Sequence, residues 1–239
     1  MEVLRNITFG LSQGDCLAVL GTNGAGKSTM LKCLNKILTP SKGNIYIDGA
    51  DTKTLSNRKL AQSIGYIAQS HGDIRKTVFD TILLGRKPYI KWDATQEDIE
   101  VVEKIISKFN LGDYAMRYTD ELSGGELQKV MIARALAQQP KVLLMDEPTS
   151  SLDMKNQLEV IKTIKDIIKE QNISVIVTMH DLNLALRFAN KFLLLKNGEV
   201  LFWGGHEVIT EESIKEVYDV RITFIEHEGI PVVVPIYNE

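Results

Sequence analysis

Cysteine is scarce in this sequence. Its 239 residues include two, Cys16 in an apolar run typical of a strand and Cys33 in a run typical of a helix. Two cysteines at this spacing exclude a disulfide-rich framework and suggest neither a metal site nor a redox pair. We therefore expect both thiols to be reduced core residues of a cytosolic protein.

An excess of positive charge is also lacking. Lys and Arg number 28 against 31 Asp and Glu, which gives a formal net charge of -3, and no basic arm or stripe is present. Nucleic-acid-binding proteins gain affinity by neutralising phosphates with surplus Lys and Arg. The charge balance therefore argues against a nucleic-acid partner.

Long hydrophobic runs are absent as well. The longest, such as ISVIVTM from Ile173, fall far short of the roughly 20 residues that a membrane helix needs. The first residues, MEVLRNITFGLSQGD, lack the basic n-region and the long apolar h-region of a secretory signal. If the protein serves a membrane, we expect it to do so from the aqueous side.

Short apolar runs that alternate with helical patterns are what the chain does contain. CLAVLG, VLLMD and ISVIVTMHD each precede a helical pattern, and IGYIA is a further buried run. This alternation predicts βαβ units and a largely parallel, buried sheet. GNIYIDG from Gly43, and LLLKNGEVLFWG with Asn197-Gly198 at its turn, predict antiparallel hairpins at a sheet edge.

Residues 70–139 interrupt the alternation with mainly helical patterns. Within them, Thr95-Gln96-Glu97-Asp98 has the pattern of a capping box ahead of apolar residues at helical spacing. No Pro/Gly/Ser-rich linker is long enough to separate domains. We therefore expect one α/β domain over 1–239, with a helical subdomain inserted at 70–139.

The stretch GTNGAGKST matches the phosphate-binding pattern G-x-x-x-x-G-K-[ST] and lies between the strand CLAVL and a helix. Backbone N–H groups of such a loop wrap phosphates, and the following helix N-terminus adds partial positive charge. We expect Lys27 to reach the β and γ phosphates and Ser28 to hold Mg²⁺. The predicted nucleotide-binding residues are Gly21, Thr22, Asn23, Gly24, Ala25, Gly26, Lys27, Ser28 and Thr29.

Acidic side chains follow the buried strand VLLMD, at the edge where open α/β sheets bind ligands. Asp146 is expected to organise Mg²⁺, directly or through water, and Glu147 to polarise the attacking water, which is the positioning task of phosphoryl transfer. A pair of solvated carboxylates at a strand end is the alternative.

Two further strand ends carry polar residues. His180 ends ISVIVTMH, where we expect a γ-phosphate contact, and Gln69 closes IGYIAQ, where we expect a ligand for Mg²⁺ and water. The alternatives are a structural histidine and a surface glutamine. If the phosphate-site interpretation is right, the predicted catalytic residues are Lys27, Gln69, Glu147 and His180.

The stretch LSGGE contains another helix start. Ser123 and Glu126 have the spacing of a capping box, but a helix start does not require two adjacent glycines. Each glycine costs roughly 0.5 to 1 kcal/mol of stability relative to alanine, because more backbone entropy is lost on folding. Gly124 and Gly125 therefore indicate that something approaches the backbone closely at this point.

Taken together, GTNGAGKST, Gln69, LSGGE, VLLMDEP, SSLD (Ser150 to Asp153) and His180, in this order and spacing, resemble the nucleotide-binding subunit of an ATP-binding cassette (ABC) transporter. The resemblance runs from about Val3 to the C-terminus. It implies a P-loop NTPase core with a mainly parallel sheet, an antiparallel edge sheet and a helical subdomain insert. It also implies an ATPase that uses ATP and Mg2+.

In that family two such domains face each other head to tail, and LSGGE of one closes over the ATP bound by the other. The resemblance implies that Ser123, Gly124, Gly125 and Glu126 meet a nucleotide on a second copy of this chain, and that Asp153 couples the two sites. The helical insert would transmit closure to separate polytopic permease subunits that work with a solute-binding protein. The expected location is the cytoplasmic face of the membrane.

Two details refine the resemblance. Gly85-Arg86-Lys87-Pro88-Tyr89 is similar to the GRxPH stretch of subunits that power uptake of iron-siderophores, haem or cobalamin, with tyrosine in place of histidine. Arg86, Lys87 and Lys91 form either a solvated basic face or a docking surface. Family members also carry an aromatic that stacks on adenine, a few residues before the position of Val3, and this sequence begins too late to include it. Either the start is truncated or misassigned, or adenine is held in some other way; we expect Phe9 to be a packing residue rather than a substitute.

The sequence also bears on other classes of ATP-binding cassette protein. A DNA-repair ATPase of this type would place a long coiled coil between Gly26 and Ser123, where no heptads occur, and a translation factor would join two cassettes. A non-hydrolysing regulator would lack the Glu147 or His180 position. An exporter remains an alternative, although exporters often fuse the cassette to membrane helices.

Overall fold

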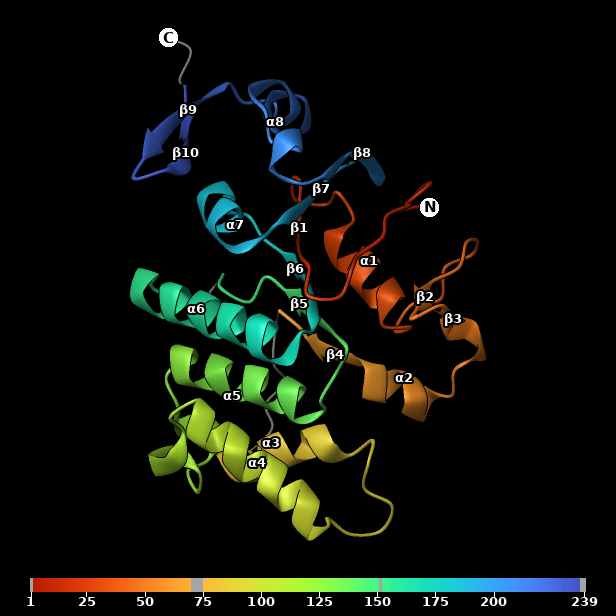
Figure 1. Ribbon diagram of the computed structural model, residues 1–239, viewed down its shortest axis with the longest axis vertical. Coiled ribbons are helices and arrows are strands. Elements are labelled where there is room, and N and C mark those ends of the chain that lie inside the picture. The colour runs from red at the N-terminus through yellow and green to blue at the C-terminus, as the bar shows by residue number, and fades with distance from the viewer. Residues whose placement is uncertain (1, 70–74, 151, 237–239) are drawn as a thin grey trace. The chain divides into compact units, whose positions relative to one another are not determined.

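A computed structural model describes residues 2–69, 75–150 and 152–236 (Figure 1). The chain divides into two compact units, Met1–Thr39 with Lys165–Glu239, and Pro40–Ile164. The division falls within the long helix α6 (Met154–Gln171). The predicted insert at 70–139 lies inside the second unit, and its boundaries stay a prediction.

The first unit contains a four-strand stretch of sheet in the order β6-β1-β7-β8. These strands are β6 (Ser174–Thr178), β1 (Cys16–Leu20), β7 (Lys191–Lys196) and β8 (Glu199–Gly204). The first three pair in parallel, and β8 pairs with β7 antiparallel. Every residue of β1 is buried, as expected for a parallel strand covered on both faces. The antiparallel edge is the predicted hairpin, with Asn197 and Gly198 both at positive φ in its turn.

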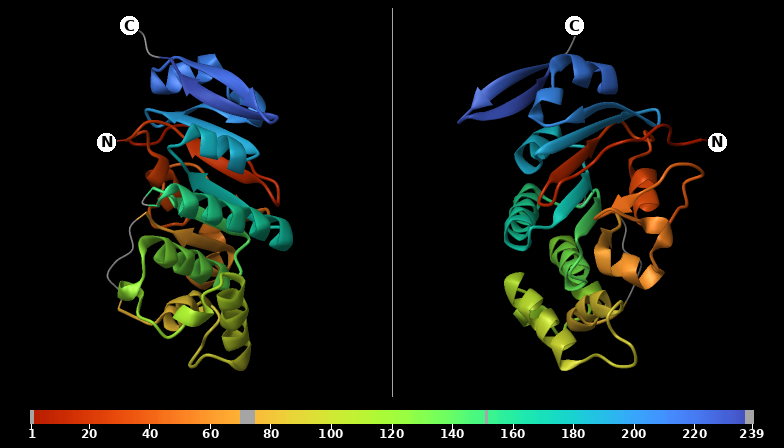
Figure 2. Two further views of the ribbon diagram at one scale, coloured as in Figure 1. Left: turned by 90° about the vertical axis from the view of Figure 1, so that its left-hand side faces the viewer. Right: turned by 45° about the vertical axis from the view of Figure 1, so that its right-hand side comes forward.

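Besides the C-terminal part of α6, the described part of the first unit contains three α-helices and a C-terminal hairpin (Figure 2). They are α1 (Lys27–Leu34), α7 (Leu182–Phe188), α8 (Glu211–Tyr218), β9 (Ile222–His227) and β10 (Ile230–Pro235). The hairpin was not among the sequence predictions. Asn183 of α7 secures it, because its Nδ2 donates to the Val233 carbonyl at 3.2 Å and its Oδ1 accepts from the Val233 N–H at 2.7 Å.

The second unit contains a parallel pair of strands, β4 (Ile64–Ile67) and β5 (Val142–Asp146). The helix α2 (Asn57–Ser63) leads into β4. The predicted hairpin at GNIYIDG is present but short, with β2 (Tyr46–Ile47) paired to β3 (Ala50–Asp51) in a sheet of its own.

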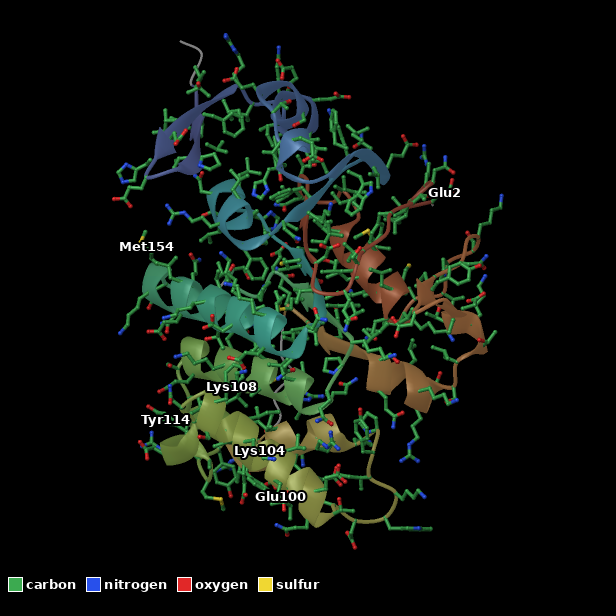
Figure 3. All side chains as sticks on the ribbon, viewed as in Figure 1. Glu2, Glu100, Lys104, Lys108, Tyr114 and Met154 are labelled. Atoms are coloured by element: carbon green, nitrogen blue, oxygen red, sulfur yellow. The ribbon has the colours of Figure 1, made fainter. Side chains whose placement is uncertain are left out.

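Three further helices of the second unit pack against one another (Figure 1): α3 (Val78–Leu83), α4 (Gln96–Lys108) and α5 (Gly124–Ala137). The predicted capping box starts α4: the Thr95 and Asp98 side chains each cap the other's backbone N–H. The opposite face of α4 meets solvent along a row of charges, as Figure 3 shows for Glu100, Lys104 and Lys108. This i, i+4 spacing places Glu100 beside the opposite charge of Lys104, and Lys104 beside the like charge of Lys108.

A buried ion pair joins these helices. The Arg86 Nε donates to Asp98 Oδ1 at 2.8 Å, and both side chains are at most 5% exposed. The Arg86 Nη1 also donates to the Ala137 carbonyl at 2.9 Å, and the guanidinium lies over the Tyr89 ring. The expectation that Arg86 belongs to a basic surface was therefore wrong, because this arginine is part of the core.

The two cysteines differ in burial. Cys16 is buried in β1, and burial raises the pKa of its thiol far above the ordinary range. Cys33 is half-buried, so the expectation of a core position was wrong for this residue. Among the described residues, no helix combines the length and apolarity needed to cross a membrane.

Candidate nucleotide and hydrolysis site

The phosphate loop leaves β1 and enters α1 as predicted, and two of its glycines are required by their surroundings. Gly21 has a positive φ, and a Cβ there would lie 2.2 Å from the Leu195 carbonyl oxygen. Gly26 caps α1 with φ +107, and a Cβ there would lie 2.7 Å from Leu4 Cδ2. The loop is thus pressed against β7 and the N-terminal segment, with Gly24 exposed at its tip.

Lys27 is held inside this loop. Its Nζ donates to the Gly21 carbonyl at 2.8 Å and to the Thr22 carbonyl at 3.1 Å, and the residue is 6% exposed. Ser28 follows in the first turn of α1 and is half-buried. A buried ammonium beside a helix N-terminus favours an anion at the loop, which fits the predicted phosphate contact.

Tyr218 supports the first residue of the loop, a role that no sequence signal indicates. The Gly21 N–H donates to the Tyr218 hydroxyl at 2.8 Å, across 197 residues of sequence. Burial raises the pKa of Tyr218 to about 12, although the hydrogen bond from Gly21 acts in the opposite direction. Tyr218, at the end of α8, therefore provides the acceptor for the Gly21 N–H, which lies where the strand turns into the loop.

The Tyr218→Phe variant should lower the free energy of unfolding by about 1–3 kcal/mol, because it leaves a buried N–H without an acceptor. Urea denaturation would measure this loss. The neutral hydroxyl is favoured in the fold, so its contribution is complete below the ordinary pKa of 10 and falls as the pH approaches 12. The control Tyr46→Phe removes a hydroxyl from a 60% exposed ring. Equal losses in the two variants would contradict the role of Tyr218.

His180 and the start of the phosphate loop lie at one edge of the first unit's sheet. Val19 of β1 is paired in register with Thr178 of β6, and the Met179 N–H donates to the Val19 carbonyl at 3.3 Å. His180, which is exposed, follows one residue later, as Gly21 follows β1. The expected meeting of these strand ends is confirmed, and the γ-phosphate contact stays a prediction.

Gln69 and Glu147 meet at the corresponding edge of the second unit. Ile67, the last residue of β4, is in register with Met145, one residue before the end of β5. Gln69 Nε2 donates to Glu147 Oε2 at 2.6 Å. Glu147 has φ +50, a left-handed conformation that non-glycine residues rarely adopt. Such strain is concentrated at functional sites. Asp146, one residue earlier, is 3% exposed.

The helix start at LSGGE is capped as predicted. The Ser123 N–H and hydroxyl donate to Glu126 Oε2 at 2.8 and 2.7 Å, and the Glu126 N–H donates back to the Ser123 hydroxyl. Hydrogen bonds from the Ser123 hydroxyl, from its N–H and from Tyr114 lower the pKa of Glu126. The lowered pKa favours the ionised carboxylate, which accepts the hydrogen bonds that cap the start of α5.

The two glycines of this stretch have different reasons to be glycine. Apart from its chain neighbours and the backbone of its own helix, no described atom lies within 4 Å of the position that a Cβ of Gly124 would occupy, and this glycine is exposed. A Cβ on Gly125 would lie 2.8 Å from the Asn156 amide of α6. The space beside Gly125 is thus filled by a side chain of the same chain, which the sequence pattern does not reveal. That a ligand approaches the backbone of Gly124 and Gly125 stays a prediction.

The segment after SSL joins this contact. Asp153 Oδ1 accepts from the Asn156 N–H at 2.8 Å, and Asp153 Oδ2 accepts from Asn156 Nδ2 at 3.0 Å. Elsewhere, Phe9 packs on Trp203 with ring centroids 5.9 Å apart, which agrees with the expected packing role.

Comparison with known proteins agrees with these geometries. The family model described as ABC transporter matches residues 4–150. An uncharacterized ABC transporter ATP-binding protein of Methanocaldococcus jannaschii is 57% identical and covers 98% of this chain and 92% of its own length. A phosphonates import ATP-binding protein of Synechococcus sp. is 36% identical over 90% of this chain and 84% of its own. The ferric enterobactin transport ATP-binding protein of Escherichia coli is 33% identical over 98% and 89%.

Solved structures give the same result. A metal-chelate type ABC transporter in an inward-facing conformation matches with a TM-score of 0.85 and 33% identity, covering 98% of this chain and 91% of its own. A dimeric post-hydrolysis state of an ATP-binding cassette, bound to ADP and Pi, matches with a TM-score of 0.75 and 30% identity over 85% and 90%. The chain therefore belongs to the ABC transporter family, as an ATP-binding subunit with ATPase activity.

Proposed function

We propose that this subunit powers the import of a metal chelate of the iron-siderophore type. The observation that carries the proposal is the share of this chain that the matches to such transporters cover. The likeness to the metal-chelate transporter and to the enterobactin relative extends over 98% of the chain, and that to a petrobactin relative of Bacillus anthracis over 97%. These matches therefore take in most of the C-terminal part, where β9 and β10 lie. Haem and cobalamin belong to the same class of metal chelate.

Import of phosphonates is the second candidate. The phosphonate relatives are somewhat more identical, at 36%, than the 33% of the enterobactin relative. Their matches cover 90% of the chain. Coverage therefore favours the metal chelate, and uptake of radiolabelled ferric siderophore against phosphonate, in cells with and without the subunit, separates the two.

Hydrolysis in this proposal is a task of positioning. The phosphate loop and Lys27 hold the β and γ phosphates, and His180 contacts the γ-phosphate from the neighbouring strand end. Glu147 orients and polarises the attacking water, and Gln69 fixes the Glu147 carboxylate through the 2.6 Å hydrogen bond. Because little covalent chemistry is needed in phosphoryl transfer, such positioning supplies most of the catalysis.

Mg²⁺ fits the residues assigned to it. Ser28 offers a hydroxyl, Asp146 a carboxylate and Gln69 an amide, an all-oxygen set of the kind Mg²⁺ prefers. Gln69 directs its Nε2 at Glu147, which leaves Oε1 as the atom for a cation. When bound with ATP, the ion would offset the negative charge of the phosphates.

A second copy of the chain completes the proposed site. Ser123 and the exposed backbone of Gly124 would donate to the γ-phosphate held by the partner, and Asp153 would face the partner across the interface. The dimeric cassette with ADP and Pi supports this arrangement as a relative of similar fold. ATP would stabilise the closed dimer through contacts that ADP cannot complete.

A basic cavity in the second unit supports docking of a membrane partner. It has a volume of about 540 Å³, and its lining includes Arg58, Lys87 and Arg134 but, among the described residues, no carboxylate. Burial lowers the pKa of Arg134. A cytoplasmic segment of the permease that carries an acidic side chain would complement these charges, and docking there would hold the subunit peripherally on the membrane.

The Lys87→Glu variant should reduce recovery of the polytopic permease about tenfold in co-purification from membranes, because it places a like charge against an acidic segment. Nucleotide binding by the isolated subunit should not change. Lys91→Glu is the matched control, since Lys91 is also exposed but does not line the cavity. Equal recovery with both variants would contradict docking in the cavity. Failure of the unaltered subunit to recover a permease would favour a cytosolic ATPase.

A further inference from the structure

The start of α6 lies against the start of α5, and one side chain makes the contact. The Asn156 amide occupies the space that a side chain on Gly125 would need, with Oδ1 and Cγ 2.8 Å from the would-be Cβ. The same amide donates from Nδ2 to Asp153 Oδ2 at 3.0 Å. Figure 3 labels Met154, which begins α6 directly after Asp153. Asn156 therefore touches both LSGGE and the segment that ends in Asp153.

A second contact, further along both helices, fixes their spacing. Lys129 Nζ donates to Glu159 Oε2 at 2.7 Å, four residues after Gly125 on α5 and three after Asn156 on α6. The residues thus repeat at helical spacing on two facing surfaces. Figure 1 shows α5 and the first half of α6 running side by side. The two helices are thus linked by side-chain contacts at two points, Asn156 with Gly125 and Lys129 with Glu159.

We propose that Asn156 is a positioning residue that ties the LSGGE helix to Asp153, so that both reach the partner's nucleotide together. The role rests on the proposed head-to-tail dimer. The Asn156 amide fills the space beside Gly125, and closely packed groups transmit displacement to one another. A shift of Gly125 on nucleotide closure would therefore carry Asn156, and Asn156 would turn the Asp153 carboxylate through its hydrogen bond.

Asp153 is oriented by two donors, of which only one depends on this side chain. Its Oδ1 accepts from the backbone N–H of residue 156, which every substitution except proline keeps. Its Oδ2 accepts from the Asn156 side-chain amide at 3.0 Å. Removing the amide should therefore leave the helix capped while it frees Asp153 to rotate.

Two substitutions separate the tie from simple packing. Asn156→Ala removes the amide and retains the cap, whereas Asn156→Asp keeps the shape against Gly125 but sets two carboxylates against each other. Both should lower kcat for ATP hydrolysis by about ten- to hundredfold, as expected for a misplaced catalytic group, with KM for ATP within about twofold. The control Asn57→Ala, an exposed residue in the first turn of α2, should leave kcat unchanged.

The second readout is the dimer formed with ATP in a chain that also carries Glu147→Gln. Adding Asn156→Ala should raise its dissociation constant about tenfold, measured by analytical ultracentrifugation, while binding of fluorescent ATP to the monomer and the urea midpoint stay unchanged. An active Asn156→Asp chain would overturn the tie and leave only a packing role. A dissociation constant unaffected by Asn156→Ala would also contradict the positioning role of Asn156, but it would leave the proposed dimer intact. A Glu147→Gln chain that stays monomeric in ATP with Asn156 intact would overturn the proposed function, and the role of Asn156 with it.

Discussion

Replacing Glu147 by glutamine should slow ATP hydrolysis by about 10²–10⁴-fold, the range that a positioned general base contributes. Glutamine keeps the size of the side chain and can still bond to Gln69, so ATP binding should persist. What is lost is the negative charge that polarises the attacking water. Phosphate release would measure the rate, and binding of a fluorescent ATP analogue would show that the phosphate loop is intact.

The same variant should accumulate as an ATP-bound dimer in size-exclusion chromatography, because hydrolysis no longer breaks the bridge between protomers. Glu100→Gln is the matched control, since Glu100 lies on the solvent face of α4 (Figure 3). The Glu100→Gln chain should hydrolyse ATP normally and should not accumulate as an ATP-bound dimer. Undiminished turnover by Glu147→Gln would show that another residue polarises the attacking water. A Glu147→Gln chain that stays monomeric in ATP would contradict a nucleotide site shared between two protomers.

Removal of the Asp98 carboxylate should lower the free energy of unfolding by about 3–5 kcal/mol, the cost of leaving a buried partner charge unpaired. Asp98→Ala strands the Arg86 guanidinium between α4 and α5, where the side chain is 3% exposed. The same substitution also removes half of the Thr95 capping box. Denaturation in urea, followed by far-ultraviolet circular dichroism, would measure the loss.

The control for this prediction is Glu97→Ala, one residue earlier in the same first turn but exposed. It should change the free energy of unfolding by about 0.5 kcal/mol or less. Acid should mimic the Asp98 variant. Burial disfavours the Asp98 carboxylate, but hydrogen bonds from Arg86 and Thr95 outweigh it and lower the pKa below the ordinary 3.8. The stabilisation is therefore present above pH 3.8 and is lost as the pH falls through the lowered pKa. Equal losses for the two alanine variants would contradict the assignment.

Local pattern was sufficient for much of the fold and of the candidate site. The phosphate loop lies between strand and helix as its spacing predicts, and both capping boxes form, because each depends on residues at most three positions apart. The pairing of Gln69 with Glu147 follows from the same kind of rule, since parallel strands bring their carboxyl ends to one edge. The subdomain boundaries and the roles in a dimer are expectations that a single chain does not test.

Other features depend on residues that no periodicity links. The Tyr218 hydroxyl accepts from the Gly21 N–H across 197 positions of the chain. From the sequence, Arg86 was expected at the surface, but in the fold it is buried against Asp98 and the end of α5. Gly125 gives a third case: its bare backbone looks like room for a ligand, yet the Asn156 amide fills that space. Hydrophobic period, helix caps and turn residues report interactions within a few positions of the chain. Which distant side chain fills a gap, or accepts a leftover N–H, is set by close packing of whole helices and strands, and so it emerges only when they are assembled.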